Sequence, residues 1–164
     1  MTEPNPGEPG SANTARMIDD LNNADIRSDG SLVGLVPAIV GDSARQLLAS
    51  GDVAIPHLIG ALEDESKFVA AHVLLTLLSA VEHHTTPWNG LKVDLSPDGQ
   101  AQFDVQQRFE ISRRWRAWHQ ATPLTPVGIA ASACWLSQRA VRIAPNREDI
   151  SRREYYVGHD GHRS

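Results

Sequence analysis

The seven histidines of this chain are candidates for metal binding. Glu82, His83 and His84 are adjacent at the expected end of a helix, and His72 lies eleven residues before His83. Eleven residues make three helical turns, so these two histidines would share a helix face but lie about 16 Å apart. One ion cannot be bound by both, and the metalloprotease motif HExxH is absent. We therefore expect no metal site and interpret the helix-end histidines as solvated.

Nucleophilic catalysis has no stronger support in the sequence. Cys134 lies in the apolar helical pattern "IAASACWLSQRAV", which is typical of a buried structural thiol. Ser43, Ser66 and Ser79 belong to no nucleophile-elbow motif, and no glycine-rich phosphate loop with its lysine is present. The sequence therefore predicts neither an enzyme nor a bound cofactor.

The composition is that of a folded, soluble protein. Hydrophobic residues make up 41% of the 164 residues, and the longest apolar runs, such as "VAAHVLLTLL", are far shorter than a membrane span. The first residues, "MTEPNPGEPGSANTAR", have no basic start and no apolar segment, so they do not resemble a secretory signal. A single cysteine excludes an internal disulfide. We expect a cytoplasmic protein that binds no membrane.

Charge is distributed unevenly along the chain. Residues 1–105 carry 5 basic and 15 acidic side chains, a net charge of −10, whereas residues 106–164 carry 10 basic and 5 acidic ones, a net charge of +5. Either the basic part meets a nucleic acid or an acidic partner, or the two parts pack against each other. We favour packing.

The basic part begins with a helical pattern over residues 105–122, "VQQRFEISRRWRAWHQAT". Its apolar side chains lie near one stripe and its arginines form a wide basic face. Three interpretations are open: the tryptophans pack on the rest of the protein while the arginines pair with its acidic surface, the face binds a protein, or the face follows the phosphates of a nucleic acid strand. We favour the first. The side chains concerned are Arg108, Phe109, Ile111, Arg113, Arg114, Trp115, Arg116 and Trp118.

Helical spacing of apolar residues predicts two elements in the first part of the chain. A short helix is expected over "TARMIDDLNNADI", with Thr14 as its N-cap. Residues 31–50 are expected to form a kinked helix or two short helices, because Gly34, Pro37 and Gly41 interrupt any straight one.

Pro56 marks the start of the next helix. In "GDVAIPHLIGALEDES" the proline falls in the first turn, where its missing N–H has no intrahelical partner to lose. The turn "EDES" then leads to a second helix, "KFVAAHVLLTLLSAV", with Val69, Val73, Leu77 and Val81 on its core face.

This helix pair resembles a HEAT or HEAT-like repeat over residues 44–78. The resemblance is carried by a helix ending in glycine, the "AIPHLI" start, an acidic turn headed by Asp64, and Val69 and Ala71 at the opening of the second helix. Ala70 departs from the pattern, because an arginine commonly stands there and contacts the aspartate of a stacked repeat. The resemblance implies a stack of helix pairs, which needs about three units or equivalent caps.

The remaining segments suit such a stack. Residues 14–50 and 105–142 would supply the flanking helices, and "KVDL" and "AQFDV" around "SPDG" predict a β-hairpin at about residues 91–105. The expected fold is therefore all-α, a short HEAT-like α-α helical repeat stack with a small inserted β-hairpin. Its single domain would cover residues 14–144, between a disordered arm at residues 1–13 and a polar tail at residues 145–164.

The predicted function is non-enzymatic protein–protein binding, as a scaffold module that uses the HEAT-like helical surface. The expected contact residues are His57 and Glu63 on the exposed repeat face, with Arg113, Arg116 and Trp118 on the basic helix. The alternative is a nucleic-acid-binding protein that uses the basic aromatic helix 105–120. DNA glycosylases on HEAT-like scaffolds are one form of it, and their pocket would need Trp115 or Trp118 exposed beside a carboxylate.

Overall fold

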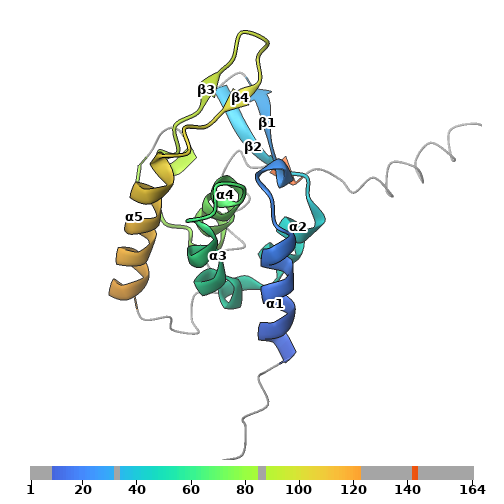
Figure 1. The fold of residues 1–164 in the computed structure, drawn as a ribbon, viewed down its shortest axis with the longest axis vertical. Coiled ribbons are helices and arrows are strands. Elements are labelled where there is room, and N and C mark those ends of the chain that lie inside the picture. Colours follow the sequence, from blue (N-terminus) through green and yellow to red (C-terminus); the bar gives the residue numbers. More distant parts are fainter. Residues whose placement is uncertain (1–8, 32–33, 85–87, 123–141, 144–164) are drawn as a thin grey trace, which may run out of the picture.

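The computed structural model describes residues 9–31, 34–84, 88–122 and 142–143. Figure 1 shows helix α4 in the middle of the molecule, with the other α-helices around it and most of the strands toward one end. The elements are, in chain order, α1 (Pro9–Asp20), η1 (Asn23–Asp25), β1 (Ile26–Ser31), β2 (Gly34–Ile39), α2 (Asp42–Ala49), η2 (Gly51–Ala54), α3 (Ile55–Ala61), α4 (Phe68–Ser79), η3 (Trp88–Gly90), β3 (Asp94–Leu95), β4 (Ala101–Gln102), α5 (Gln107–Ala121) and β5 (Arg142–Ile143).

The expectation of an all-α, HEAT-like stack is wrong, because the fold is mixed. β1 and β2 pair antiparallel along their whole length, from Ile26 opposite Ile39 to Ser31 opposite Gly34. β5 adds to β2 in parallel and completes a three-stranded sheet. Strand content is small, but this sheet occupies the place where the sequence analysis put the first part of a helical repeat.

The residues of β2 explain why the helical interpretation failed there. Apolar residues of this short run fit helix and strand spacing equally well, and periodicity alone does not separate the two. Gly34 and Pro37 oppose a helix, while Val36 and Ile39 favour the extended backbone. Alternate residues Val36 and Ala38 are buried, and Ile39 joins the core at the end of the sheet.

Helix α2 lies within the residues 31–50 for which helical structure is expected, and α3 begins where Pro56 predicts. α2 starts at Asp42, and Gly51 follows it with a φ of 64°, a backbone conformation that glycine adopts without strain. The prediction for Pro56 is confirmed, because it lies in the first turn of α3.

Helix α4 is buried on all sides rather than along one stripe. Ten of its residues are buried, and it packs against α2, α3 and the strand β1. A helix that is apolar all round belongs in the centre of a domain, whereas a repeat helix keeps one face for solvent or for the next repeat. Helix α4 is therefore at the centre of one hydrophobic core, to which the surrounding elements contribute.

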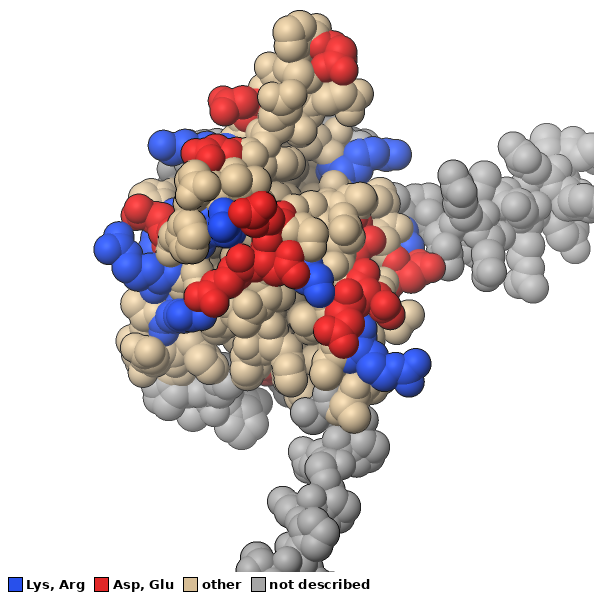
Figure 2. All heavy atoms as spheres, viewed as in Figure 1, with Lys and Arg blue, Asp and Glu red and all other residues tan. Residues whose placement is uncertain are grey.

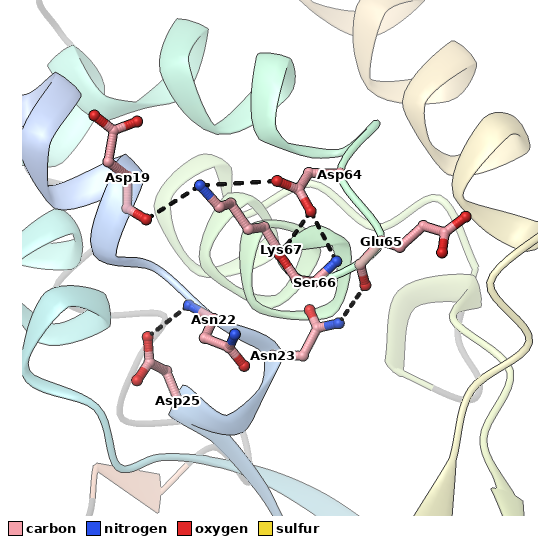
Figure 3. Close-up of polar contacts among 8 residues, drawn as sticks. All are labelled: Asp19, Asn22, Asn23, Asp25, Asp64, Glu65, Ser66 and Lys67. Atoms are coloured by element: carbon pink, nitrogen blue, oxygen red, sulfur yellow. Dashed lines mark hydrogen bonds and ion pairs between the residues drawn. The ribbon is translucent and has the colours of Figure 1, made fainter.

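The first turn of α4 is capped by a side chain from a distant part of the chain. Asn23 Oδ1 accepts hydrogen bonds from the N–H groups of Val69 and Ala70, at 2.9 and 3.4 Å. Asn23 Nδ2 donates to the carbonyl of Glu65 at 2.7 Å (Figure 3). The first four N–H groups of a helix lack intrahelical partners, and Lys67 at the N-cap offers no side-chain hydrogen bond. Asn23 satisfies two of these groups.

The turn between α3 and α4 is ordered by its own side chains as well. Asp64 Oδ1 accepts hydrogen bonds from the N–H and the hydroxyl of Ser66, at 2.8 and 2.6 Å (Figure 3). These bonds to Ser66 are the main reason that the pKa of Asp64 is lowered. Lys67 Nζ donates to the carbonyl of Asp19 at 3.2 Å, which ties the turn to the end of α1.

Strands β3 and β4 pair antiparallel within the range 91–105, where the sequence analysis places a hairpin. Ser96 and Gln100 close the turn: the N–H of Ser96 donates to the carbonyl of Gln100 at 2.9 Å, and the hydroxyl of Ser96 accepts from the N–H of Gln100 at 3.1 Å. Gly99 takes the positive φ, 81°, that this turn requires.

Several expectations fall at the edges of the described residues or beyond them. α1 begins at Pro9, so it includes residues 9–13, which the sequence analysis assigned to a disordered arm. Cys134, the second helix of the expected pair and the tail at residues 145–164 lie outside the described residues. Within the part of the chain that is described, no helix combines the length and the apolar character needed to cross a bilayer.

Candidate functional site

A polar network in the core joins α4, α5 and η3. The indole Nε1–H of Trp115 donates to His72 Nδ1 at 2.9 Å, and His72 Nε2 lies 2.8 Å from the carbonyl oxygen of Trp88. An indole N–H only donates and a carbonyl only accepts, so His72 is neutral with its proton on Nε2. Burial, opposed in part by the Trp88 hydrogen bond, lowers the pKa of His72 to about 4. Both ring nitrogens are satisfied, and His72 is therefore a structural histidine.

Asn89 fixes the loop that follows α4. It adopts a φ of 56°, in the left-handed region that asparagine tolerates better than most residues. Its Oδ1 accepts from the N–H groups of His83 and His84, at 2.6 and 3.2 Å. Its Nδ2 donates to Thr76 Oγ1 at 3.0 Å and to the carbonyl of Val81 at 2.8 Å. The loop and the end of α4 are held as one unit.

A polar cleft of about 560 Å³ lies between this loop and α5. Its volume is within the range of sites that hold a small molecule or a few side chains. Gln107 lines the cleft and links α5 to Lys92, because its side chain and the backbone of Lys92 exchange two hydrogen bonds, at 2.8 and 3.1 Å. The lining includes His84, Gly90, Lys92, Asp104, Glu110 and Arg114.

Gly90 brings the groups of this cleft close together. It has a φ of 90°, and a Cβ atom at this position would lie 2.6 Å from Arg114 Nη1 and 2.7 Å from His84 Cδ2. Contacts below 3.0 Å are essentially never seen for a Cβ, so Arg114 and His84 occupy the space that any side chain at this position would need. The Asn-Gly pair at residues 89–90 thus shapes one wall of the cleft.

The charges of the cleft differ in how they are satisfied. Asp104 Oδ1 accepts from the N–H of Gln106 at 2.9 Å, and Glu110 pairs with Arg113 at 3.4 Å. Arg114 and Lys92 form no side-chain hydrogen bond or ion pair with any other described residue, and Arg114 Nε is buried without a hydrogen-bond partner. Arg114 also contributes, after burial, to the lowered pKa of His83. The cleft thus holds two cations and two carboxylates, and Lys92 and Arg114 have no ion-pair partner among the described residues.

The five residues predicted from the sequence do not form one site. Glu63 and Arg116 are brought together by an ion pair of 2.7 Å. Arg113 is 77% exposed and pairs with Glu110, while Trp118 packs partly against the core with its ring edge-on to Trp115. His57 is half-buried on α3 and forms no hydrogen bond or ion pair with another described residue. None of the five lines the cleft.

The favoured interpretation of the basic helix, packing against the acidic part, agrees with the contacts of α5. Arg116 pairs with Glu63, and Arg108 pairs with Glu65 at 2.9 Å, so both arginines bind the acidic turn between α3 and α4. Figure 2 shows this acidic turn near the middle of the visible face, with basic side chains of α5 beside it. Trp115 is completely buried, and neither Trp115 nor Trp118 lines the cleft. Trp115 is therefore not available as the exposed ring of a glycosylase pocket, and Trp118 lies outside this cleft.

We expect the Arg116–Glu63 pair to contribute little to stability. Both side chains are about half exposed, at 47% and 55%, and exposed pairs typically contribute about 0.2–1 kcal/mol. A double-mutant cycle with Arg116→Ala and Glu63→Ala, followed by urea unfolding, measures the coupling. The coupling should shrink further at high salt. A coupling above about 2 kcal/mol would contradict this reading of the pair as an exposed contact.

Phe109 is the most exposed aromatic side chain among the described residues, at 57%. It lies in the first turn of α5, and the guanidinium of Arg108 is 4.3 Å from the centre of its ring. Arg108 is itself fixed by Glu65 and by a hydrogen bond of 2.7 Å to the carbonyl of Val105. The exposed ring is therefore held against a fixed cation.

Sequence reasoning missed most of the cleft. Arg114 was noticed only as one member of a basic face, and its position at the cleft depends on how α5 packs against the loop after α4. The signal that was present is the Asn89-Gly90 dipeptide, a pair typical of left-handed backbone. Within the described residues, no group of three or more histidine, cysteine, aspartate or glutamate side chains is arranged to hold a metal ion.

These features define a small domain of mixed α and β structure, built around a buried helix and carrying a polar cleft beside α5. Comparison of the chain with protein-family models, with curated proteins and with solved structures gave no match. The resemblance of residues 44–78 to HEAT repeats therefore remains a prediction from the residues alone.

Proposed function

We propose that this protein is a non-enzymatic binding module that holds a segment of a partner protein on the outward face of α5. The observation that carries the proposal is the exposure of Phe109. Its aromatic ring is 57% exposed, whereas Ile111 and Trp115 on the same helix are buried in the core. Aromatic residues are enriched among the few side chains that dominate the energy of protein interfaces.

The setting of Phe109 favours binding for a second reason. Arg108 stacks on its ring and is fixed at both sides by Glu65 and Val105, so the aromatic ring is held in place before any partner arrives. Ordering a side chain on binding costs free energy, and a ring already held in position avoids part of that cost. Glu110 and Arg113, next to Phe109 and one helical turn after it, are exposed charged residues of α5 and would supply the polar rim that such interfaces have.

The proposal uses α5 and makes no use of a repeat stack. Its location is proposed to be the cytoplasm, since the single cysteine fits a reducing compartment. Binding of nucleic acid by the same helix is the competing outcome of the experiment below.

The test is capture of partners by the tagged full chain from the lysate of its native cells, with and without nuclease. We expect to capture a partner protein that stays bound after nuclease treatment. We expect Phe109→Ser to weaken the binding of this partner by about tenfold or more, because truncation of an anchor side chain commonly has this effect. The purified partner is then titrated against both chains by calorimetry.

Val53→Ser is the matched control, because Val53 is 58% exposed but lies in η2 rather than in α5. It should leave the affinity unchanged, and thermal unfolding of both variants should match the original chain. Equal capture by the Phe109 variant would refute the proposal. Loss of all captured material on nuclease treatment would instead favour nucleic-acid binding.

A further inference from the structure

We propose that the cleft between Gly90 and Arg114 binds a carboxylate, carried by an aspartate or glutamate of the partner segment. This inference rests on the proposed function and extends it from one exposed ring to a second, chemically distinct contact. It assigns to the partner an acidic residue close to the side chain that covers Phe109.

The first argument is the state of Arg114. Its guanidinium lines the cleft, its Nε is buried without a hydrogen-bond partner, and it forms no ion pair with another described residue. The buried Nε is out of reach of a ligand, but the guanidinium carries its charge without a counter-ion among the described residues, and an anion in the cleft would supply one at the terminal nitrogens. The planar fork of arginine matches the two oxygens of a carboxylate.

The second argument is the cradle around the guanidinium. Gly90 leaves no Cβ between Arg114 Nη1 and the edge of His84, so the arginine lies directly against the backbone of η3. Asn89 and its four hydrogen bonds hold that backbone in place. The cation is therefore positioned by a rigid wall rather than by a flexible surface loop.

The third argument concerns which anion fits. Lys92 adds a second cation without a partner, while Asp104 and Glu110 place negative charge on the side of α5. The two carboxylates offset the two cations, so the second negative charge of a phosphate gains little net attraction in this cleft. Removing that second charge from water still costs free energy, which favours the singly charged carboxylate.

A titration of the full chain with a capped glutamate, N-acetylglutamate methylamide, tests the site without any partner. We expect saturable shifts of the amide resonances of Gly90 and Lys92 in NMR spectra, with a dissociation constant on the order of millimolar, since so small a ligand makes few contacts. Capped glutamine, the uncharged analogue, should produce no saturable shift. Inorganic phosphate should bind more weakly than the capped glutamate.

Arg114→Gln should weaken binding of the capped glutamate by about tenfold, because it removes the charged donor pair. Arg116→Gln is the matched control, since Arg116 is an exposed arginine of the same helix that lies outside the cleft and pairs with Glu63, which does not line it either. If Arg114→Gln does not fold, Lys92→Gln carries the test, because Lys92 is exposed, and it should weaken binding about threefold.

Three results would overturn the inference: no saturable shift at the cleft, equal effects of the Arg116 and Arg114 variants, or tighter binding of phosphate than of capped glutamate. The outcome is independent of the capture experiment. If the capped glutamate binds and Phe109→Ser has no effect on capture, the anion site is supported and binding of a partner through Phe109 is rejected. If Phe109→Ser loses the partner and the capped glutamate does not bind, binding through Phe109 is supported and the anion site is rejected.

Discussion

Replacing Trp115 with alanine should lower the free energy of unfolding by about 3–5 kcal/mol, the range typical for removing a large aromatic side chain from a core. Trp115 is completely buried, and its ring packs edge-on against His83 and Trp118 at centroid distances of 4.6 and 5.4 Å. The substitution also leaves His72 Nδ1 buried without its donor, which adds to the loss. Urea unfolding followed by circular dichroism measures the change.

Trp115→Phe separates the two parts of this effect. The phenyl ring keeps most of the packing but removes the indole N–H, so the expected loss is about 1–3 kcal/mol, the cost of leaving a buried acceptor unsatisfied. Phe109→Ser serves as the surface control on the same helix and should change stability by less than about 0.5 kcal/mol. Trp115→Ala with near-original stability would show that α5 does not pack on α4 as described.

The second large effect is a loss of stability on acidification through His72. The folded protein holds this histidine neutral with a pKa of about 4, whereas a histidine in an unfolded chain has a pKa of about 6.5. Below about pH 6.5 the unfolded chain binds a proton that the folded chain does not, so stability falls as the pH drops toward about 4. The expected loss from this group is about 2 kcal/mol between pH 7 and pH 5.

Two neighbouring groups affect the protonation of His72, and a variant that lacks this histidine provides the control. Arg114 and His83 are the charged or titratable groups that act on His72, and both oppose its protonation. A His72→Gln variant cannot be protonated and should lose about 2 kcal/mol less than the original chain over the same pH interval. Identical pH profiles for the original chain and the His72 variant would contradict the neutral, buried state of His72.

The sequence predicts the local elements of this protein better than their arrangement. Helix starts follow from local chemistry, so Pro56 correctly indicates the beginning of α3, and the pattern of residues 105–122 correctly indicates α5. The apolar run around Val36 was misinterpreted because its spacing fits a helix, while the partner that makes it a strand lies in β1. Pairing across a sheet is a property of two segments and is not visible in either one.

The candidate site shows the same division. The pairing of α5 arginines with acidic residues was inferred correctly from the charge distribution, because opposite net charges on two parts of a chain favour their contact. The positions of Arg114 and Gly90 at one cleft depend on the packing of α5 against a loop more than twenty residues earlier. The spacing of residues along the chain does not show that Arg114 and Gly90 lie close together. Burial of His72 was equally invisible, since a histidine in an apolar helix pattern is consistent with either a satisfied core residue or a ligand.

The cap that Asn23 places on α4 limits how the chain can be divided. In a repeat protein each unit carries the means to end its own helices, so a unit can be copied, deleted or moved. Here the helix pair at residues 44–78 depends on an amide 46 positions before Val69, in a segment outside the pair. The part of the sequence that most resembles an independent module therefore lacks the means to begin its own central helix. Duplication or transfer of residues 44–78 alone would carry α4 without its cap. A segment that is to fold with α4 capped must therefore also include η1.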